Sequence, residues 1–100
     1  MTMYARVATF EGGQADAIRA NGEEIASRAD SGPPEGVPAV GFTLLLDPEG
    51  GRGLAISLFE TEDDLRAGDA VLNEMTPPHE GMGHRASLDV YEVAVDIRTE

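Results

Sequence analysis

Two apolar segments joined by a short turn sequence constrain the fold of this chain more than any other feature. The first segment, 37–47, closes in the run Phe-Thr-Leu-Leu-Leu at 42–46, and the second spans 53–60. Between them stands Asp-Pro-Glu-Gly-Gly-Arg at 47–52, whose Pro and Gly residues favour a tight chain reversal. The pattern predicts a β-hairpin, and the apolar run predicts a strand that is covered on both faces.

A strand–helix unit precedes the hairpin, and a helix–strand unit follows it. Residues 2–10 alternate as a strand does, and 14–30 carries a helical stripe that ends at the Gly/Pro segment 31–36. Thr61 can cap a second helix, which stops at 76–78 (Thr-Pro-Pro), and 86–98 alternates as a long final strand. The predicted buried stripes are Ile18, Gly22, Ile25 and Ala29 in the first helix and Leu65, Gly68, Leu72 and Met75 in the second.

The order of these segments is βαββαβ. It predicts an α+β, ferredoxin-like fold in which a four-stranded antiparallel sheet carries two helices on one face, as one domain over 1–100. Two helices cover only one sheet face, yet adjacent strand residues such as Leu44 and Leu45 are both apolar. An uncovered apolar face is an association surface, so we expect a homodimer that forms through the open face of the sheet.

Composition excludes several classes of function. The 19 Asp and Glu residues against seven Arg give a net charge of -12, which disfavours binding to nucleic acid or to an anionic membrane surface. The absence of Cys excludes disulfides, thiolate zinc sites, iron–sulfur ligation and Cys nucleophiles. No segment approaches the ~20 apolar residues of a membrane span, and the start shows no secretory signal, so the expected compartment is the cytoplasm.

Several segments together resemble the antibiotic biosynthesis monooxygenase (ABM) family of the dimeric α/β-barrel superfamily. They are 4–7 with 10–12, the hairpin 41–60, the helix opener 61–65 and the final 91–95. The resemblance covers nearly the whole chain and implies two ferredoxin-like protomers that form a β-barrel. It also implies a small aromatic or polyketide-like ligand bound between sheet and helices.

The resemblance implies a monooxygenase that needs no metal or flavin, so we expect no cofactor. The alternative is a non-catalytic homodimer that binds a small apolar ligand or is purely structural. Haem-degrading relatives use a Trp, an Asn and a His, whereas this chain has no Trp and only Asn73 on the second helix, which disfavours haem degradation. Asn73, Tyr91 and Arg6 match, in residue type, groups that monooxygenase relatives place near the substrate.

Arg6 is the candidate cation of the interior. It lies mid-strand on the face opposite Met3, Ala5 and Val7, so it faces the barrel interior or the dimer interface if those three meet the helices. A guanidinium there needs a carboxylate or an anionic ligand. One interpretation is an ion pair with Glu60 or Glu92, and the other is a handle for a phenolate or carboxylate substrate.

Two histidines complete the candidate catalytic set. His79 and His84 are five residues apart in a Gly-rich segment, which is not metalloprotease spacing, and we interpret the segment as a lid or a solvated loop rather than a metal site. Either imidazole titrates in the range of a useful base. The candidate catalytic residues are therefore Arg6, His79 and His84, and the candidate substrate-binding residues are Tyr4, Phe10, Phe42, Phe59, Asn73 and Tyr91.

Overall fold

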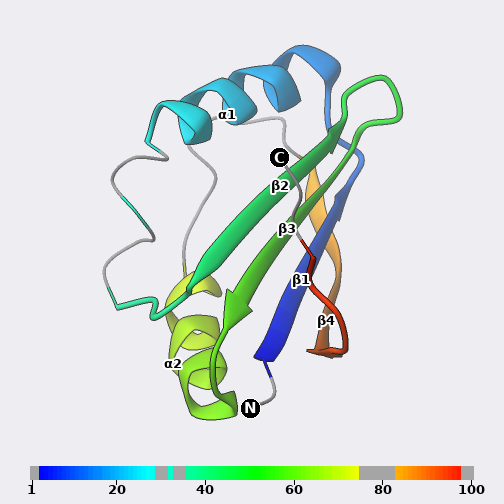
Figure 1. Cartoon of the computed structure of the whole chain (residues 1–100). Helices are drawn as coiled ribbons and strands as arrows, with labels where there is room; N and C mark the ends of the chain where they lie inside the picture. The colour runs from blue at the N-terminus through cyan, green and yellow to red at the C-terminus, as the bar shows by residue number, and fades with distance from the viewer. Residues whose placement is uncertain (1–2, 29–31, 33–35, 75–82, 98–100) are drawn as a thin grey trace.

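Four antiparallel strands form one sheet in the order β2-β3-β1-β4 (Figure 1). A computed structural model describes residues 3–28, 32, 36–74 and 83–97. Its elements are β1 (Met3–Glu11), α1 (Ala15–Ser27), β2 (Gly41–Asp47), β3 (Arg52–Phe59), α2 (Glu62–Leu72) and β4 (His84–Val93). The predicted ferredoxin-like βαββαβ fold is confirmed.

The predicted hairpin joins β2 and β3, with Asp47 opposite Arg52. The Asp47 carboxylate accepts hydrogen bonds from Arg52 Nη2 at 2.8 Å and from the backbone N–H of Gly50 at 3.1 Å. These two donors, the Arg52 guanidinium first, hold the pKa of Asp47 below its ordinary value. Gly51 has φ +70°, and a Cβ there would lie 2.7 Å from the carbonyl oxygen of Gly13, so this turn position requires glycine.

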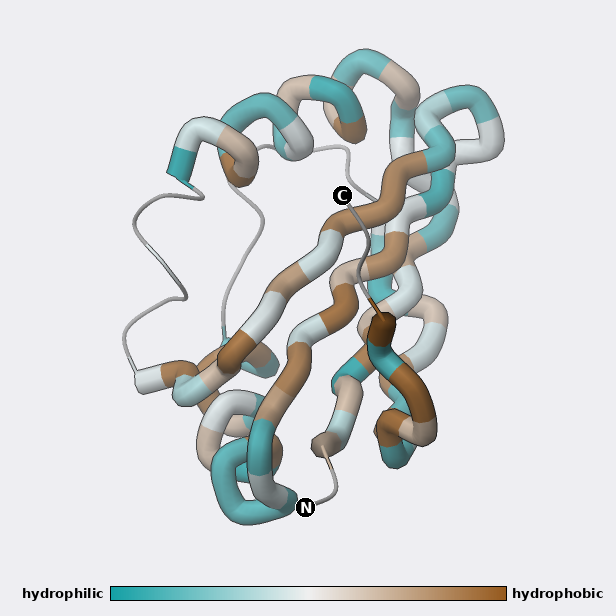
Figure 2. Tube along the Cα trace, viewed as in Figure 1, coloured by the Kyte–Doolittle hydropathy of each residue, from teal (hydrophilic) through white to brown (hydrophobic). Residues whose placement is uncertain are grey.

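Both helices pack on the same face of the sheet, and glycine at each contact lets the helix approach closely. In α2, a Cβ on Gly68 would stand 2.6 Å from Cε1 of the fully buried Phe59. In α1, a Cβ on Gly22 would stand 2.5 Å from Cδ1 of Leu46. The core under α2 consists of Val37, Phe59 and Leu65, surrounded by Tyr4, Ala39, Val71 and Leu72. Apolar positions follow β2 and β3 in Figure 2, whereas hydrophilic and apolar positions are mixed along the two helices.

β1 does not meet the condition on which Arg6 would face the barrel interior or the dimer interface, because Met3, Ala5 and Val7 do not face the helices. Tyr4, Arg6 and Ala8 lie on the helix-facing side, because Tyr4 pairs with Phe59 and Arg6 with Ser57. Met3, Ala5 and Val7 therefore lie on the other, outer side of the sheet. Alternation could not assign the two sides, since Ala5 on one side and Ala8 on the other are both buried.

The last strand is displaced from the predicted 86–98 and runs from His84 to Val93. It ends at Val93, which pairs with Met3, the first residue of β1. The pairing with β1 also shifts register between Thr9 and Phe10, so that Phe10 lies opposite Arg85. This shift turns Arg85 to the helix-facing side, as a β-bulge does to the side chains beyond it.

Neither α1 nor α2, the helices of the described residues, covers the outer face of the sheet, which includes Val7, Leu54, Ile56 and Leu58 in the central strands. Leu45 and Tyr91 on this face remain 48% and 55% exposed. The structure thus contains the uncovered apolar face that the strand pattern predicts. Neither helix in the described part of the chain has the length and apolar character that crossing a bilayer demands.

Candidate functional site

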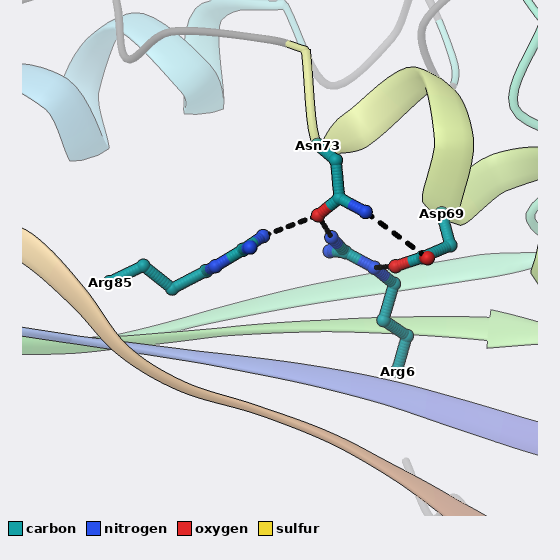
Figure 3. A network of polar contacts seen from close by, with 4 residues as sticks. All are labelled: Arg6, Asp69, Asn73 and Arg85. Atoms are coloured by element: carbon teal, nitrogen blue, oxygen red, sulfur yellow. Dashed lines mark hydrogen bonds and ion pairs between the residues drawn. The ribbon is translucent and has the colours of Figure 1, made fainter.

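Four side chains from three elements form one polar network on the helix-facing side of the sheet (Figure 3). Arg6 Nε of β1 donates to Asp69 Oδ1 of α2 at 2.7 Å, and Arg6 Nη2 donates to Asn73 Oδ1 at 3.0 Å. Asn73 Nδ2 in turn donates to Asp69 Oδ2 at 3.1 Å. Arg85 Nη1 of β4 donates to the same Asn73 Oδ1. The network ties the C-terminal half of α2 to two strands.

Arg6 is the buried centre of this network, with a side chain that is 5% exposed, whereas its partner Asp69 is 33% exposed. The interpretation of Arg6 as one half of an ion pair is correct, but the predicted partners Glu60 and Glu92 are wrong. Asp69 is the partner because Arg6 points toward α2 and not toward the open face of the sheet. A buried guanidinium held by a carboxylate and an amide satisfies its charge within the protein.

Arg85 differs from Arg6 in both exposure and partners. Its side chain is exposed, and Asn73 is the acceptor that it contacts. Among the residues that the structure describes, Arg6, Arg19, Arg28, Arg52 and Arg66 each form an ion pair, and Arg85 is the arginine that forms none. The network therefore carries one guanidinium whose charge no carboxylate of the described residues offsets.

An apolar surface groove of about 400 Å³ lies on the same side of α2 as the network. Its lining consists of Tyr4 from β1, Glu62, Leu65 and Arg66 from α2, and Val90, Tyr91 and Glu92 from β4. Tyr91 pairs with Ala5 and so borders the groove from the outer side of the edge strand β4. We refer to the seven lining residues as the α2–β4 groove. Val90 pairs with Arg6 across β1 and β4, so the groove begins in the same cross-strand row as the network. Its volume falls in the usual range for small-molecule sites, ~300–1,000 Å³.

The structure brings together some of the predicted site residues and separates others. Tyr4 and Tyr91 line the groove, and Asn73 joins Arg6. Phe59 is buried in the core, while Phe10 pairs with Arg85 beside the network, and Phe42, half-exposed, lies on the edge strand β2.

Of the two candidate histidines, the described residues include His84, which does not join Arg6. His84 is the first residue of β4 rather than part of a loop, and it pairs with Glu11 at the end of β1. Arg6 pairs with Val90, six residues further along β4, which corresponds to ~20 Å of strand. His79 lies outside the described residues.

Sequence reasoning missed Asp69 and Arg85. A signal for Asp69 exists, because Asp69 and Asn73 are four residues apart and so share one face of a helix. No comparable signal exists for Arg85, since simple alternation opposite β1 would place it next to Glu11 on the outer face. The register shift that reverses its direction is a property of the folded sheet.

Comparison with solved structures finds the same architecture in a known protein. The chain is similar to the haem degrader MhuD from Mycobacterium tuberculosis, whose structure has two haems bound in its active site. The TM-score is 0.64 with 21% identity, over 95% of this chain and 99% of that one. No family model and no curated protein matches the sequence. At this level of identity the likeness shows the fold and nothing finer.

The site combines an apolar groove with the guanidinium group of Arg6, which lies in the row of Val90, and with that of Arg85, which pairs with Phe10 and reaches Arg6 through Asn73 Oδ1. Guanidinium groups bind carboxylate and other oxyanions through paired N–H donors, and they stabilise negative charge that develops on an enolate or phenolate oxygen. Of the two, Arg85 is exposed and has donors left for a ligand, whereas Arg6 is committed to Asp69 and Asn73. The arrangement is suited to an aromatic molecule that carries an oxygen-bearing polar group.

Proposed function

We propose that this chain is an ABM-like protein that binds a small aromatic or polyketide-like molecule in the α2–β4 groove. The observation that carries the proposal is the position of the groove, with Tyr4, Leu65 and Val90 beside the row that holds Arg6. Small-molecule sites combine a mostly apolar lining with few convergent polar groups, and this region has both. The likeness of fold to MhuD, which binds haem, supports a ligand on a fold of this kind.

Haem is one ligand to consider, since MhuD degrades it. The network offers a cation to a haem carboxylate. Within the described residues, however, it brings no imidazole alongside, because His84 lies at the far end of β4. The described residues therefore supply a partner for the carboxylates but no iron ligand. Haem enters the test as one probe among several.

Ligand binding is tested on the full-length protein by isothermal titration calorimetry. The probes are 2-naphthalenesulfonate, 2-naphthamide and haemin, and native mass spectrometry of the protein from its own host reports any co-purified ligand. The groove variant is Val90→Glu, because Val90 is exposed, whereas a substitution of the groove residue Leu65 would disturb the buried core. The matched control Val40→Glu is equally exposed at 52% but is not among the groove residues.

We expect micromolar to millimolar binding of at least one probe, weakened ~10-fold or more by Val90→Glu and unchanged by Val40→Glu. The absence of binding by all three probes, together with a bare mass in the native spectrum, would overturn the proposed function. Equal effects of the two variants would place the ligand elsewhere on the molecule.

Cofactor-independent oxygenation is a second candidate function, favoured by the guanidinium network that Arg6 joins to the row of the groove residue Val90. In such a reaction the substrate loses a proton to form a carbanion, which transfers electrons to dioxygen, while the protein stabilises the anion. An oxygen electrode with an anthrone as substrate measures it directly. Oxygen uptake above the rate without protein, lowered by Arg85→Gln, supports catalysis. An unchanged rate restricts the function to binding.

We also propose that two copies pair through the outer face of the sheet. The support is the uncovered apolar surface there, which a second copy would bury. Leu45→Glu alters this face at a position that is already 48% exposed, whereas Val40→Glu alters a similarly exposed position that precedes β2. Sedimentation velocity should show a dimer for the parent and for Val40→Glu but a monomer for Leu45→Glu. A monomeric parent protein would refute the dimer.

A further inference from the structure

The partner of Arg85 distinguishes it from the other described arginines. Each of the others contacts a carboxylate, from the buried pair of Arg6 with Asp69 to the surface pair of Arg66 with Glu62 on α2. In a chain with a net charge of -12, a carboxylate is the usual neighbour for a guanidinium. Arg85 instead contacts the neutral side-chain carbonyl of Asn73.

The amide of Asn73 has one orientation in this network. Its Oδ1 accepts from Arg6 Nη2 and from Arg85 Nη1, while its Nδ2 donates to Asp69 Oδ2. The reversed amide would direct its NH₂ group at two guanidinium groups and its carbonyl at a carboxylate. Asn73 therefore fixes the position of Arg85 as a carboxylate would, but without offsetting its charge.

We propose that Asn73 is a specificity-determining residue that holds Arg85 in place while reserving its positive charge for a singly charged anionic ligand. The proposal rests on the proposed function and names the ligand class of that same site. Arg6 and Asp69 cancel, so the four-residue network carries one surplus positive charge, contributed by Arg85. One surplus charge matches one carboxylate, sulfonate or phenolate.

The charges around the groove orient such a ligand. Two carboxylates line the groove away from the network. Glu92 pairs with Tyr4, two residues beyond the pairing of Arg6 with Val90, and Glu62 begins α2 at the end opposite Asn73 and pairs with Arg66. A negative group is disfavoured beside Glu92 and favoured beside Arg85. The apolar body of the ligand lies along Tyr4 and Val90, and its anionic group lies toward the C-terminal end of α2.

The test compares a charged and a neutral ligand of the same shape, 2-naphthalenesulfonate and 2-naphthamide, by calorimetry at pH 7. The variant Asn73→Asp has nearly the same shape as the parent side chain but places a carboxylate against Arg85. The variant Arg85→Gln removes the charge itself. The control Arg19→Gln removes an exposed, weakly paired charge from α1.

We expect the parent protein and Arg19→Gln to bind the sulfonate ~10-fold or more tightly than the amide, and both network variants to lose that preference while keeping their affinity for the amide. Because a sulfonate stays charged in acid, the preference of Asn73→Asp should return only when the introduced carboxyl is protonated, and the two guanidinium groups beside it lower its pKa below the ordinary value of about 4. Circular dichroism at each pH confirms that the fold is retained.

Three outcomes are distinguishable. A parent protein that binds both ligands equally, or an Asn73→Asp variant that keeps the preference at pH 7, overturns the role of Asn73 while ligand binding stands. Loss of affinity for both ligands in Asn73→Asp shows that Asn73 is merely structural, which also overturns the proposal. A parent that binds neither ligand overturns the proposed function and this inference with it.

Discussion

Substituting the two helix glycines that contact the sheet tests whether the packing of α2 on Phe59 is as tight as the structure shows. In a helix interior, Gly→Ala stabilises by about 1 kcal/mol through helix propensity alone. At Gly68 the new methyl group would stand 2.6 and 2.8 Å from two atoms of the Phe59 ring and 3.3 Å from Val37 Cγ1. Phe59 is fully buried, so its ring has no free space into which to move.

Such overpacking costs about 1–3 kcal/mol, which exceeds the gain in propensity. Gly68→Ala should therefore lower the free energy of unfolding by about 1–2 kcal/mol, equivalent to a fall in Tm of ~4–16 °C for a chain of this length. Gly22→Ala is the matched control, because its methyl group would meet only the Cδ1 end of Leu46, which is 36% exposed and can rotate away. That variant should be as stable as the parent or more so.

Urea denaturation followed by far-ultraviolet circular dichroism, at one fixed protein concentration, measures both values. A Gly68→Ala variant at least as stable as the parent would refute the reasoning, because α2 would then lie further from the sheet than described. Equal destabilisation by the two substitutions would refute it as well, since the propensity gain and the freedom of Leu46 would both have been misjudged.

Three further predictions concern charge. Arg6→Met should lower the free energy of unfolding by about 2 kcal/mol, because it leaves Asp69 without its buried hydrogen-bonded partner; urea denaturation showing a loss below about 0.5 kcal/mol would contradict this. The Asp47 carboxyl, whose pKa is lowered in the folded state, contributes stability that is present above about pH 4 and is lost as the pH falls through its folded pKa. Arg52→Gln should raise the NMR titration midpoint of Asp47 toward its ordinary value, and an unmoved midpoint would remove Arg52 as the cause. The proposed dimer would carry twice the chain's charge of -12, so its dissociation constant should fall between 20 and 200 mM salt as repulsion is screened; a rise measured by sedimentation would contradict the prediction.

The sequence was sufficient to predict the elements and their order, because each carries a local signal. Helical spacing identified Leu65 and Gly68 of α2, both of which are buried, and Thr61 caps that helix by accepting from the backbone N–H of Asp64. The hairpin followed from the Gly and Pro content of its turn. Each of these signals belongs to residues within or next to the element that it predicts. The prediction of that element therefore does not depend on contacts with distant parts of the chain.

The direction of Arg6 and Arg85 could not be predicted in the same way. β1 has buried residues on both of its faces. The alternation of its side chains therefore divides them into two sets but does not show which set faces the helices. Arg85 depends on a register shift between β1 and β4, which involves strands that are separated by most of the chain. The candidate site is therefore less predictable than the fold, because its geometry is determined by long-range pairing.

The end of α2 explains why two arginines from different strands meet there. The first turn of α2 contains Glu62, Asp63 and Asp64, whose negative charges interact favourably with the positive end of the helix dipole. The last turn of α2 contains no basic residue that would interact with the negative end. Arg6 and Arg85, from β1 and β4, supply positive charge at that negative end. Asp69 offsets one of them, and Asn73, the C-cap residue, offsets neither. The C-terminal end of a helix dipole is equivalent to only about half a negative charge. The full positive charge of Arg85, which contacts the neutral amide of Asn73, therefore exceeds what is needed to offset that end of the helix. An anionic ligand is the partner that this excess suits.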